Sequence, residues 1–207
     1  MKNINWKYII ITSLSCLLSV FLGLVVWDSL PDKMAIHFDV YNQPDNFVSK
    51  GFAVFALPLI MMGTQVICCI VTDINSSSHG GQKKFERITK WIIPVITFVL
   101  QILTISFNLG KNVDIRKSCA LVVGIMFLVI GSNLPKLDYV KNYKFDTETA
   151  RKINRFMGFE TVIMGILMII SIFLPPVATV ICLFMLIPYT LIGVIYTIIK
   201  SRKKSGN

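Results

Sequence analysis

Long runs of apolar residues, separated by short polar connections, dominate the pattern of this 207-residue chain. A bilayer core about 30 Å thick needs about 20 apolar residues in a helix that rises about 1.5 Å per residue. Six apolar runs with at most one charged residue come near that length, and each predicts a transmembrane helix. They are Tyr8–Trp27, Phe52–Val71, Trp91–Leu109, Cys119–Leu134, Phe156–Leu174 and Val177–Ile199.

The ends or the length of particular runs refine this prediction. The first run ends in residues 25–28, Val-Val-Trp-Asp, which is no small-residue cleavage site, so it predicts a retained helix. The fourth run is the shortest and needs either a tilted neighbour or a locally thinned bilayer. Only Pro175 and Pro176 separate the last two runs, which predicts an antiparallel pair of helices.

Composition and charge agree with a membrane protein and indicate its orientation. Hydrophobic residues make up 54% of the chain and charged residues only 15%. Sixteen of the 21 Lys and Arg residues lie in connections on one side of the predicted helices, and cytoplasmic loops are the ones that carry such an excess. The chain is therefore predicted to be an all-α polytopic membrane protein with six transmembrane helices and both termini in the cytoplasm.

The net charge of +10 does not indicate a nucleic-acid partner, because the basic residues flank apolar runs, where lipid head groups are their neighbours.

The pattern of apolar runs and connections divides the chain into three predicted parts. Residues 1–71 form two helices with an outer loop at 28–51, and residues 72–90 form a cytoplasmic loop. Residues 91–207 form four helices with a cytoplasmic loop at 135–155 and a basic tail at 200–207.

The outer loop, LPDKMAIHFDVYNQPDNFVSKG, is the most informative connection. Its middle alternates between two faces, which predicts a short β-strand. Ile36, Phe38 and Val40 lie on one face, and His37, Asp39 and Tyr41 lie on the other. Pro31 with Asp32 and Pro44 with Asp45 have the chemistry of turns and bound the strand, so an ordered loop is expected.

Four Asp residues, Asp28, Asp32, Asp39 and Asp45, against Lys33 and Lys50 make the loop at 28–51 mildly acidic, which favours a cationic peptide as its partner. The alternative is that His37 and Asp39 pair with each other on a solvated face. One His and scattered carboxylates do not supply three or four metal ligands, and all five cysteines lie in apolar runs. Neither a metal nor another cofactor is expected.

The elements LP, IHFD, N, PD and SKG, followed by the second apolar run, resemble the DUF1648 domain at the amino end of SdpI-type bacterial immunity proteins. GSNLPK at 131–136 and KINRFMG at 152–158 look like a second signature of that family. The resemblance implies outer positions that face a toxin, namely Pro31, His37, Asp39, Asn42, Pro44, Asp45, Ser49 and Lys50. It also implies cytoplasmic positions that face a partner, namely Asn133, Pro135, Lys136, Lys152 and Arg155.

What the resemblance implies about function is a six-span protein of the bacterial cell membrane that protects against a secreted toxic peptide. It also implies a role in holding a transcriptional repressor at the membrane. The alternative is a small transporter or flippase-like module. No HExxH, GxSxG or P-loop motif is present, so an enzyme is not expected. Oligomeric state is not predicted.

Four of the polar residues inside the predicted helices are candidates for a structural or functional role. Gln65, Gln101 and Asn108 are expected to hydrogen-bond across helices. Glu160 is predicted in the first turn of the fifth helix, where a carboxylate favours the helix N-terminus and can reach Arg155. The alternative for Glu160 is a buried relay or binding role, which is the default reading of an ionisable group in a membrane.

Overall fold

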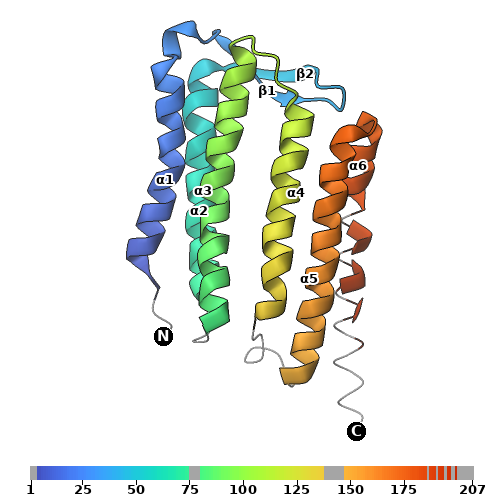
Figure 1. Ribbon diagram of the computed structural model, residues 1–207. Coiled ribbons are helices and arrows are strands. Elements are labelled where there is room, and N and C mark those ends of the chain that lie inside the picture. The colour runs from blue at the N-terminus through green and yellow to red at the C-terminus, as the bar shows by residue number, and fades with distance from the viewer. Residues whose placement is uncertain are drawn as a thin grey trace. The chain divides into compact units, whose positions relative to one another are not determined.

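A computed structural model describes residues 4–74, 80–137, 147–185, 187–189, 191–193, 195, 196 and 199. The basic tail at 200–207 and part of the predicted loop at 135–155, residues 138–146, lie outside these residues. The described chain is mainly helical, with one small antiparallel sheet (Figure 1). Its helices are α1 Trp6–Val25, α2 Leu57–Ile74, α3 Gly80–Asn108, α4 Ile115–Asn133, α5 Thr147–Ile170 and α6 Pro176–Phe184.

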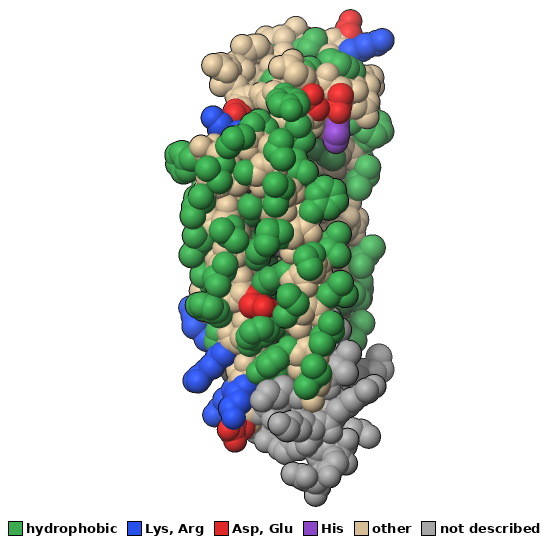
Figure 2. All heavy atoms as spheres, turned by 90° about the vertical axis from the view of Figure 1, so that its right-hand side faces the viewer, with side chains coloured by type: hydrophobic (Ala, Val, Ile, Leu, Met, Phe, Trp, Pro, Cys, Tyr) green, Lys and Arg blue, Asp and Glu red, His purple; other side chains and the backbone are tan. Residues whose placement is uncertain are grey.

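Within the described residues, six helical segments are long and apolar enough to cross a membrane, as the sequence predicted. The fourth span, Ile115–Lys136, has 22 residues and is longer than expected, because α4 begins before Cys119 and continues into a 3-10 turn at Leu134–Lys136. Large hydrophobic side chains such as those of Phe21, Ile67 and Phe159 are exposed. In Figure 2 hydrophobic side chains cover most of the middle of the face shown, which is typical of a lipid-facing surface.

The connection predicted at 72–90 is mostly helical, because α2 continues to Ile74 and α3 already begins at Gly80. The chain separates into two compact units. The first unit contains Met1–Ser76 and Glu86–Cys119, and the second contains Ser77–Phe85 and Ala120–Asn207. Each unit has its own packing.

The first unit consists of α1, α2, most of α3 and a β-hairpin that connects α1 to α2. The hairpin lies at the end of these helices where α1 ends and α2 begins (Figure 1). A buried cluster joins them, and its members are Leu30, Met34, Ala53, Val54 and Ile105. We call this end of the first unit the hairpin end.

The second unit depends on close contact between α4 and α5. Gly124 and Gly131 of α4 lie against Gly165 and Gly158 of α5, and a Cβ on Gly131 would lie 2.8 Å from the carbonyl oxygen of Gly158. The glycines are seven residues apart on each helix, so they fall on one helix face. Small residues let the two backbones approach closely, which is a common way for membrane helices to associate.

Candidate functional site

The outer loop folds into a hairpin of two strands, β1 Lys33–Phe38 and β2 Pro44–Ser49, where the sequence predicted one strand. Val40 and Tyr41 belong to the turn and not to a strand. The cause is Asp39, whose Oδ1 accepts hydrogen bonds from the backbone N–H of Tyr41 at 2.9 Å and of Gln43 at 2.8 Å. This Asx-type turn reverses the chain, and the segment after Pro44 then pairs with β1.

Asn42 fixes the tip of the hairpin. Its φ of +63° lies in the left-handed region, which Asn tolerates better than most residues. Its side chain bonds the connection between α3 and α4 in two directions. Oδ1 accepts from the N–H of Ile115 at 2.8 Å, and Nδ2 donates to the carbonyl of Val113 at 3.1 Å. One amide therefore ties the hairpin to a segment about seventy residues away.

Replacing Asn42 by Ala should lower the free energy of unfolding of the first unit by about 2–3 kcal/mol, because two hydrogen bonds are lost and a φ unfavourable for Ala remains. Asn42→Gly loses the same bonds but fits the φ, so it should cost about 1 kcal/mol less than Ala. Chemical unfolding of the purified protein in detergent measures both. Equal stability of the Ala variant and the wild type would contradict this account.

Asn108, predicted to bond across helices, instead holds strand β1. Its Oδ1 accepts from the N–H of Ala35 at 2.8 Å, and its Nδ2 donates to the carbonyl of Ala35 at 2.9 Å. The side-chain amide thus pairs with β1 as a neighbouring strand would. The adjacent Phe107 contacts Phe38 edge-on, with ring centroids 4.5 Å apart. Together these contacts fasten β1 to the end of α3.

The charged groups of the hairpin form separate pairs. His37 Nδ1 lies 2.5 Å from Asp45 Oδ1, so its partner is Asp45 and not Asp39 as one prediction held. Lys50 Nζ lies 3.3 Å from Asp32 Oδ1 and 5.2 Å from the ring centroid of Trp27. The remaining predicted toxin-facing positions have local roles or are exposed. Pro31 is exposed, Pro44 begins β2, and the Ser49 hydroxyl accepts from the N–H of Phe52 at 3.3 Å.

Gln65 and Gln101 lie between α2 and α3, fully buried, and each donates to a backbone carbonyl near a proline. Gln65 Nε2 donates at 2.6 Å to the carbonyl of Lys90, and the residue four positions on is Pro94, which has no N–H. Gln101 Nε2 donates at 3.3 Å to the carbonyl of Ala53. That carbonyl lies in a π-helical turn, Phe52–Ala56, and the residue five positions on is Pro58. Each glutamine thus supplies a donor that a proline lacks.

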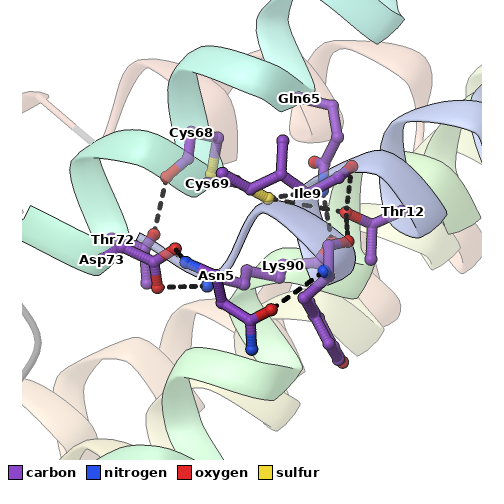
Figure 3. Close-up of polar contacts among 10 residues, drawn as sticks. Asn5, Ile9, Thr12, Gln65, Cys68, Cys69, Thr72, Asp73 and Lys90 are labelled. Atoms are coloured by element: carbon purple, nitrogen blue, oxygen red, sulfur yellow. Dashed lines mark hydrogen bonds and ion pairs between the residues drawn. The ribbon is translucent and has the colours of Figure 1, made fainter. Parts of the chain in front are cut away.

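At the opposite end of the first unit lies a buried ion pair that the sequence did not predict. Lys90 Nζ bonds Asp73 Oδ1, and the two side chains are only 6% and 9% exposed. Asp73 Oδ2 also accepts from the N–H of Asn5 at 3.1 Å, and Lys90 lies 5.5 Å from the ring centroid of Tyr8. Figure 3 shows Asp73 and Lys90 pointing toward each other, with Asn5 beside the carboxylate. The pair connects α2, α3 and the chain that enters α1.

In the second unit the structure brings the two halves of the second signature together. A Cβ on Gly158 would lie 2.7 Å from Pro135 Cδ, and Asn154 Nδ2 donates to the carbonyl of Leu137 at 2.7 Å. Asn133 Nδ2 donates to the carbonyl of Val129 one helical turn back. Gly158 and Asn154 therefore pack α5 against the segment that ends α4, whereas the bond of Asn133 stays within α4. The basic members are at the surface: Lys136 and Arg155 are exposed, and Lys152 pairs with Glu148 at 2.6 Å.

The expected position of Glu160 in the first turn of its helix is wrong. Helix α5 begins at Thr147, so Glu160 lies more than three turns into it and inside the span Arg151–Phe173. Helical structure extends into the polar segment before the apolar run, which the run alone did not reveal. A capping role is therefore excluded. Next to it, Thr161 accepts a hydrogen bond from the Tyr189 hydroxyl at 3.1 Å.

Comparison with known proteins gives two matches. Residues 14–62 match the family described as a domain of unknown function, DUF1648, which covers the hairpin and parts of α1 and α2. Over 173 residues the chain is 28% identical to Immunity protein SdpI of Bacillus subtilis (strain 168), a match that covers 79% of this chain and 81% of that protein. Both findings support an SdpI-type family. The resemblance drawn from the motifs is thus confirmed, and the findings support a multi-pass protein of the bacterial membrane. No solved structure matches.

Proposed function

We propose that this SdpI-type chain is an immunity protein that protects its cell against a secreted antimicrobial peptide, which it meets at the hairpin end. The name of its relative supports immunity. We choose the hairpin end as the binding surface because the hairpin is firmly attached to the rest of the first unit. Asn42 and Asn108 make four hydrogen bonds between the hairpin and distant segments. A surface fixed in this way loses little conformational entropy when a partner binds.

The orientation that this proposal needs rests on the distribution of basic residues. Sixteen of the 21 Lys and Arg residues lie in the predicted connections on the other side of the membrane from the outer loop, so the hairpin end is expected outside the cell. A secreted peptide reaches that side first. To test this orientation, a cysteine is introduced at Asn46, which is exposed. A membrane-impermeant thiol reagent should label this cysteine on intact cells.

The immunity proposal is tested by expressing the chain in a bacterium that a candidate peptide kills. The wild type should raise the lethal concentration. Asp45→Asn, which removes an exposed charge and its pairing with His37, should reduce protection about fivefold, as expected for about 1 kcal/mol of lost interaction. Asp39→Asn is the matched control, because an Asn Oδ1 can still accept both turn hydrogen bonds.

Two outcomes would contradict parts of this proposal. Unchanged sensitivity in cells that express the wild type would exclude immunity against that peptide. Equal loss of protection in the Asp45 and Asp39 variants would exclude a specific contribution of Asp45. Membrane levels of each variant must be matched before lethal concentrations are compared.

The other two predicted functions stay predictions. Repressor docking would use the exposed Lys136 and Arg155, and deletion of the loop that joins α4 to α5 followed by pull-down from cytosol tests it. A transporter would need polar groups in its interior. Within the described residues, Ser13 Oγ, Gln65 Oε1 and Gln101 Oε1 are buried without a hydrogen-bond partner, and flux measurements in liposomes test whether solute passes them.

A further inference from the structure

The two outer edges of the hairpin differ. On the outer edge of β1, the N–H and the carbonyl of Ala35 are both bonded to Asn108. The Asn108 side chain thus bonds both outward groups of Ala35, as the backbone of a neighbouring strand would. Natural sheets often block their edges in some such way, because unpaired backbone groups attract a further strand.

The register shows which groups of β2 point outward. Ala35 lies opposite Phe47, and because its N–H and carbonyl point away from β2, the pair is a non-hydrogen-bonded one. The bond from Lys50 N–H to the Asp32 carbonyl, 2.9 Å long, gives the pair Lys33 and Ser49 the same geometry. The N–H and carbonyl groups of Phe47 and Ser49 therefore point away from β1.

The outer edge of β2 is open in the described chain. Asp45, Asn46, Phe47 and Ser49 are all exposed, and the Phe47 side chain is 54% exposed. The outward N–H groups of Phe47 and Ser49 are two residues apart, which is the spacing at which an added strand forms its bonds, and helical structure begins directly after Ser49, at Lys50. Pro44, the one residue of β2 that cannot donate, is at its beginning.

We propose that this edge binds an extended segment of a cationic peptide by strand addition, as a third strand beside β2. The inference rests on the proposed function and names how the peptide is held. Main-chain hydrogen bonds supply affinity in this mode, and neighbouring side chains supply selectivity. Here Phe47 offers an aromatic contact. Asp28, Asp32 and Asp45 are exposed in the outer loop at 28–51, whereas Lys50, one of the two lysines of that loop, is held by Asp32 and Trp27.

Phe47→Pro tests the edge, because proline removes an N–H that points away from β1 and leaves the β1–β2 ladder intact. Phe47→Ala is the matched control, since it removes the ring but keeps the N–H. The probe is a short synthetic peptide in which Lys alternates with Val, and its affinity for the purified full chain in detergent is measured by fluorescence anisotropy. Affinity should fall about tenfold in the Pro variant and about threefold or less in the Ala variant.

Probe chemistry gives a second measurement that does not depend on a variant. Two N-methylated versions of the peptide are compared, one methylated at every Lys and the other at every Val. Each lacks the N–H donors on one edge, and the version methylated on the edge that faces β2 should not bind. A peptide with Glu in place of Lys should bind more weakly. Unchanged affinity of the Pro variant, equal binding of both N-methylated peptides and the parent, or equal binding of the Glu peptide would overturn the inference. So would a Pro variant that alters only the association of two copies of the chain.

Failure of this inference and failure of the proposed function give different results. If the wild type and Phe47→Pro protect cells equally, strand addition is excluded and immunity stands. If the wild type gives no protection but peptide binding still depends on the N–H of Phe47, the edge is a peptide site and immunity is excluded. Thermal unfolding of the Pro variant within a few degrees of the wild type, as expected for an edge substitution, establishes that its hairpin is intact.

Discussion

Lys90→Met should lower the free energy of unfolding of the first unit by about 3–5 kcal/mol, because it leaves the carboxylate of Asp73 buried without its cation. Of the two described hydrogen bonds to Asp73, the one from the N–H of Asn5 would remain. The variant also removes the ammonium group that lies over the Tyr8 ring. Unfolding by increasing fractions of a denaturing detergent, followed by circular dichroism, measures the loss.

The double variant Lys90→Met with Asp73→Leu separates a lost charge pair from a lost fold. Replacement of both members of a buried pair by apolar residues is often close to neutral, so most of the stability should return. The chain also offers an exposed pair as a control. Lys152 bonds Glu148 on the surface of α5, and Lys152→Met should cost less than about 1 kcal/mol. Equal losses for Lys90→Met and Lys152→Met would contradict the importance of burial.

The sequence predicted the six helices because each transmembrane span is visible as an apolar run of the required length. An apolar run near the thickness of a bilayer has few alternatives in a membrane, where every backbone group must be bonded within the segment. The limits of the helices were less predictable. Helix α3 begins eleven residues before its apolar run, and α5 begins nine residues before its own. Polar residues can continue a helix beyond the bilayer core, which hydropathy does not detect.

The buried pair was missed for the same reason. Asp73 and Lys90 lie beyond the apolar runs and were assigned to a connecting loop. A signal was present in the sequence, since opposite charges flank the ends of two consecutive helices and would meet in an antiparallel pair. What the sequence could not supply was the length of the helical extensions that bring them together.

The hairpin shows a different limit. Alternation predicted a strand, and Asn42 and Asp39 were predicted to face a toxin, but their structural roles in the turn were not predicted. The partners of Asn42 and the residue that holds Ala35 lie about seventy residues away along the chain. A side-chain amide such as that of Asn108 can bond another helix or a strand equally well, and only the tertiary structure decides between them.

Gly131→Ala should destabilise the second unit by about 1–3 kcal/mol, the usual cost of inserting a methyl group where backbone leaves no room. The new Cβ would lie 2.8 Å from both the Gly158 carbonyl oxygen and the Val162 nitrogen, so α4 and α5 must move apart. Separation would also weaken the contacts at Gly124 and Gly165, which lie on the same interface. Gly158→Ala should have a similar cost, because its Cβ would lie 2.7 Å from the Gly131 carbonyl oxygen.

Gly63→Ala is the matched control for this prediction. Gly63 lies inside α2, and a Cβ added there meets no atom within 4 Å. Since Ala is favoured over Gly in a helix by about 0.8–1.0 kcal/mol, this variant should be as stable as the wild type or more stable. The same unfolding assay in denaturing detergent compares all three variants. If Gly131→Ala were as stable as Gly63→Ala, the close approach of α4 and α5 could not be what holds the second unit together.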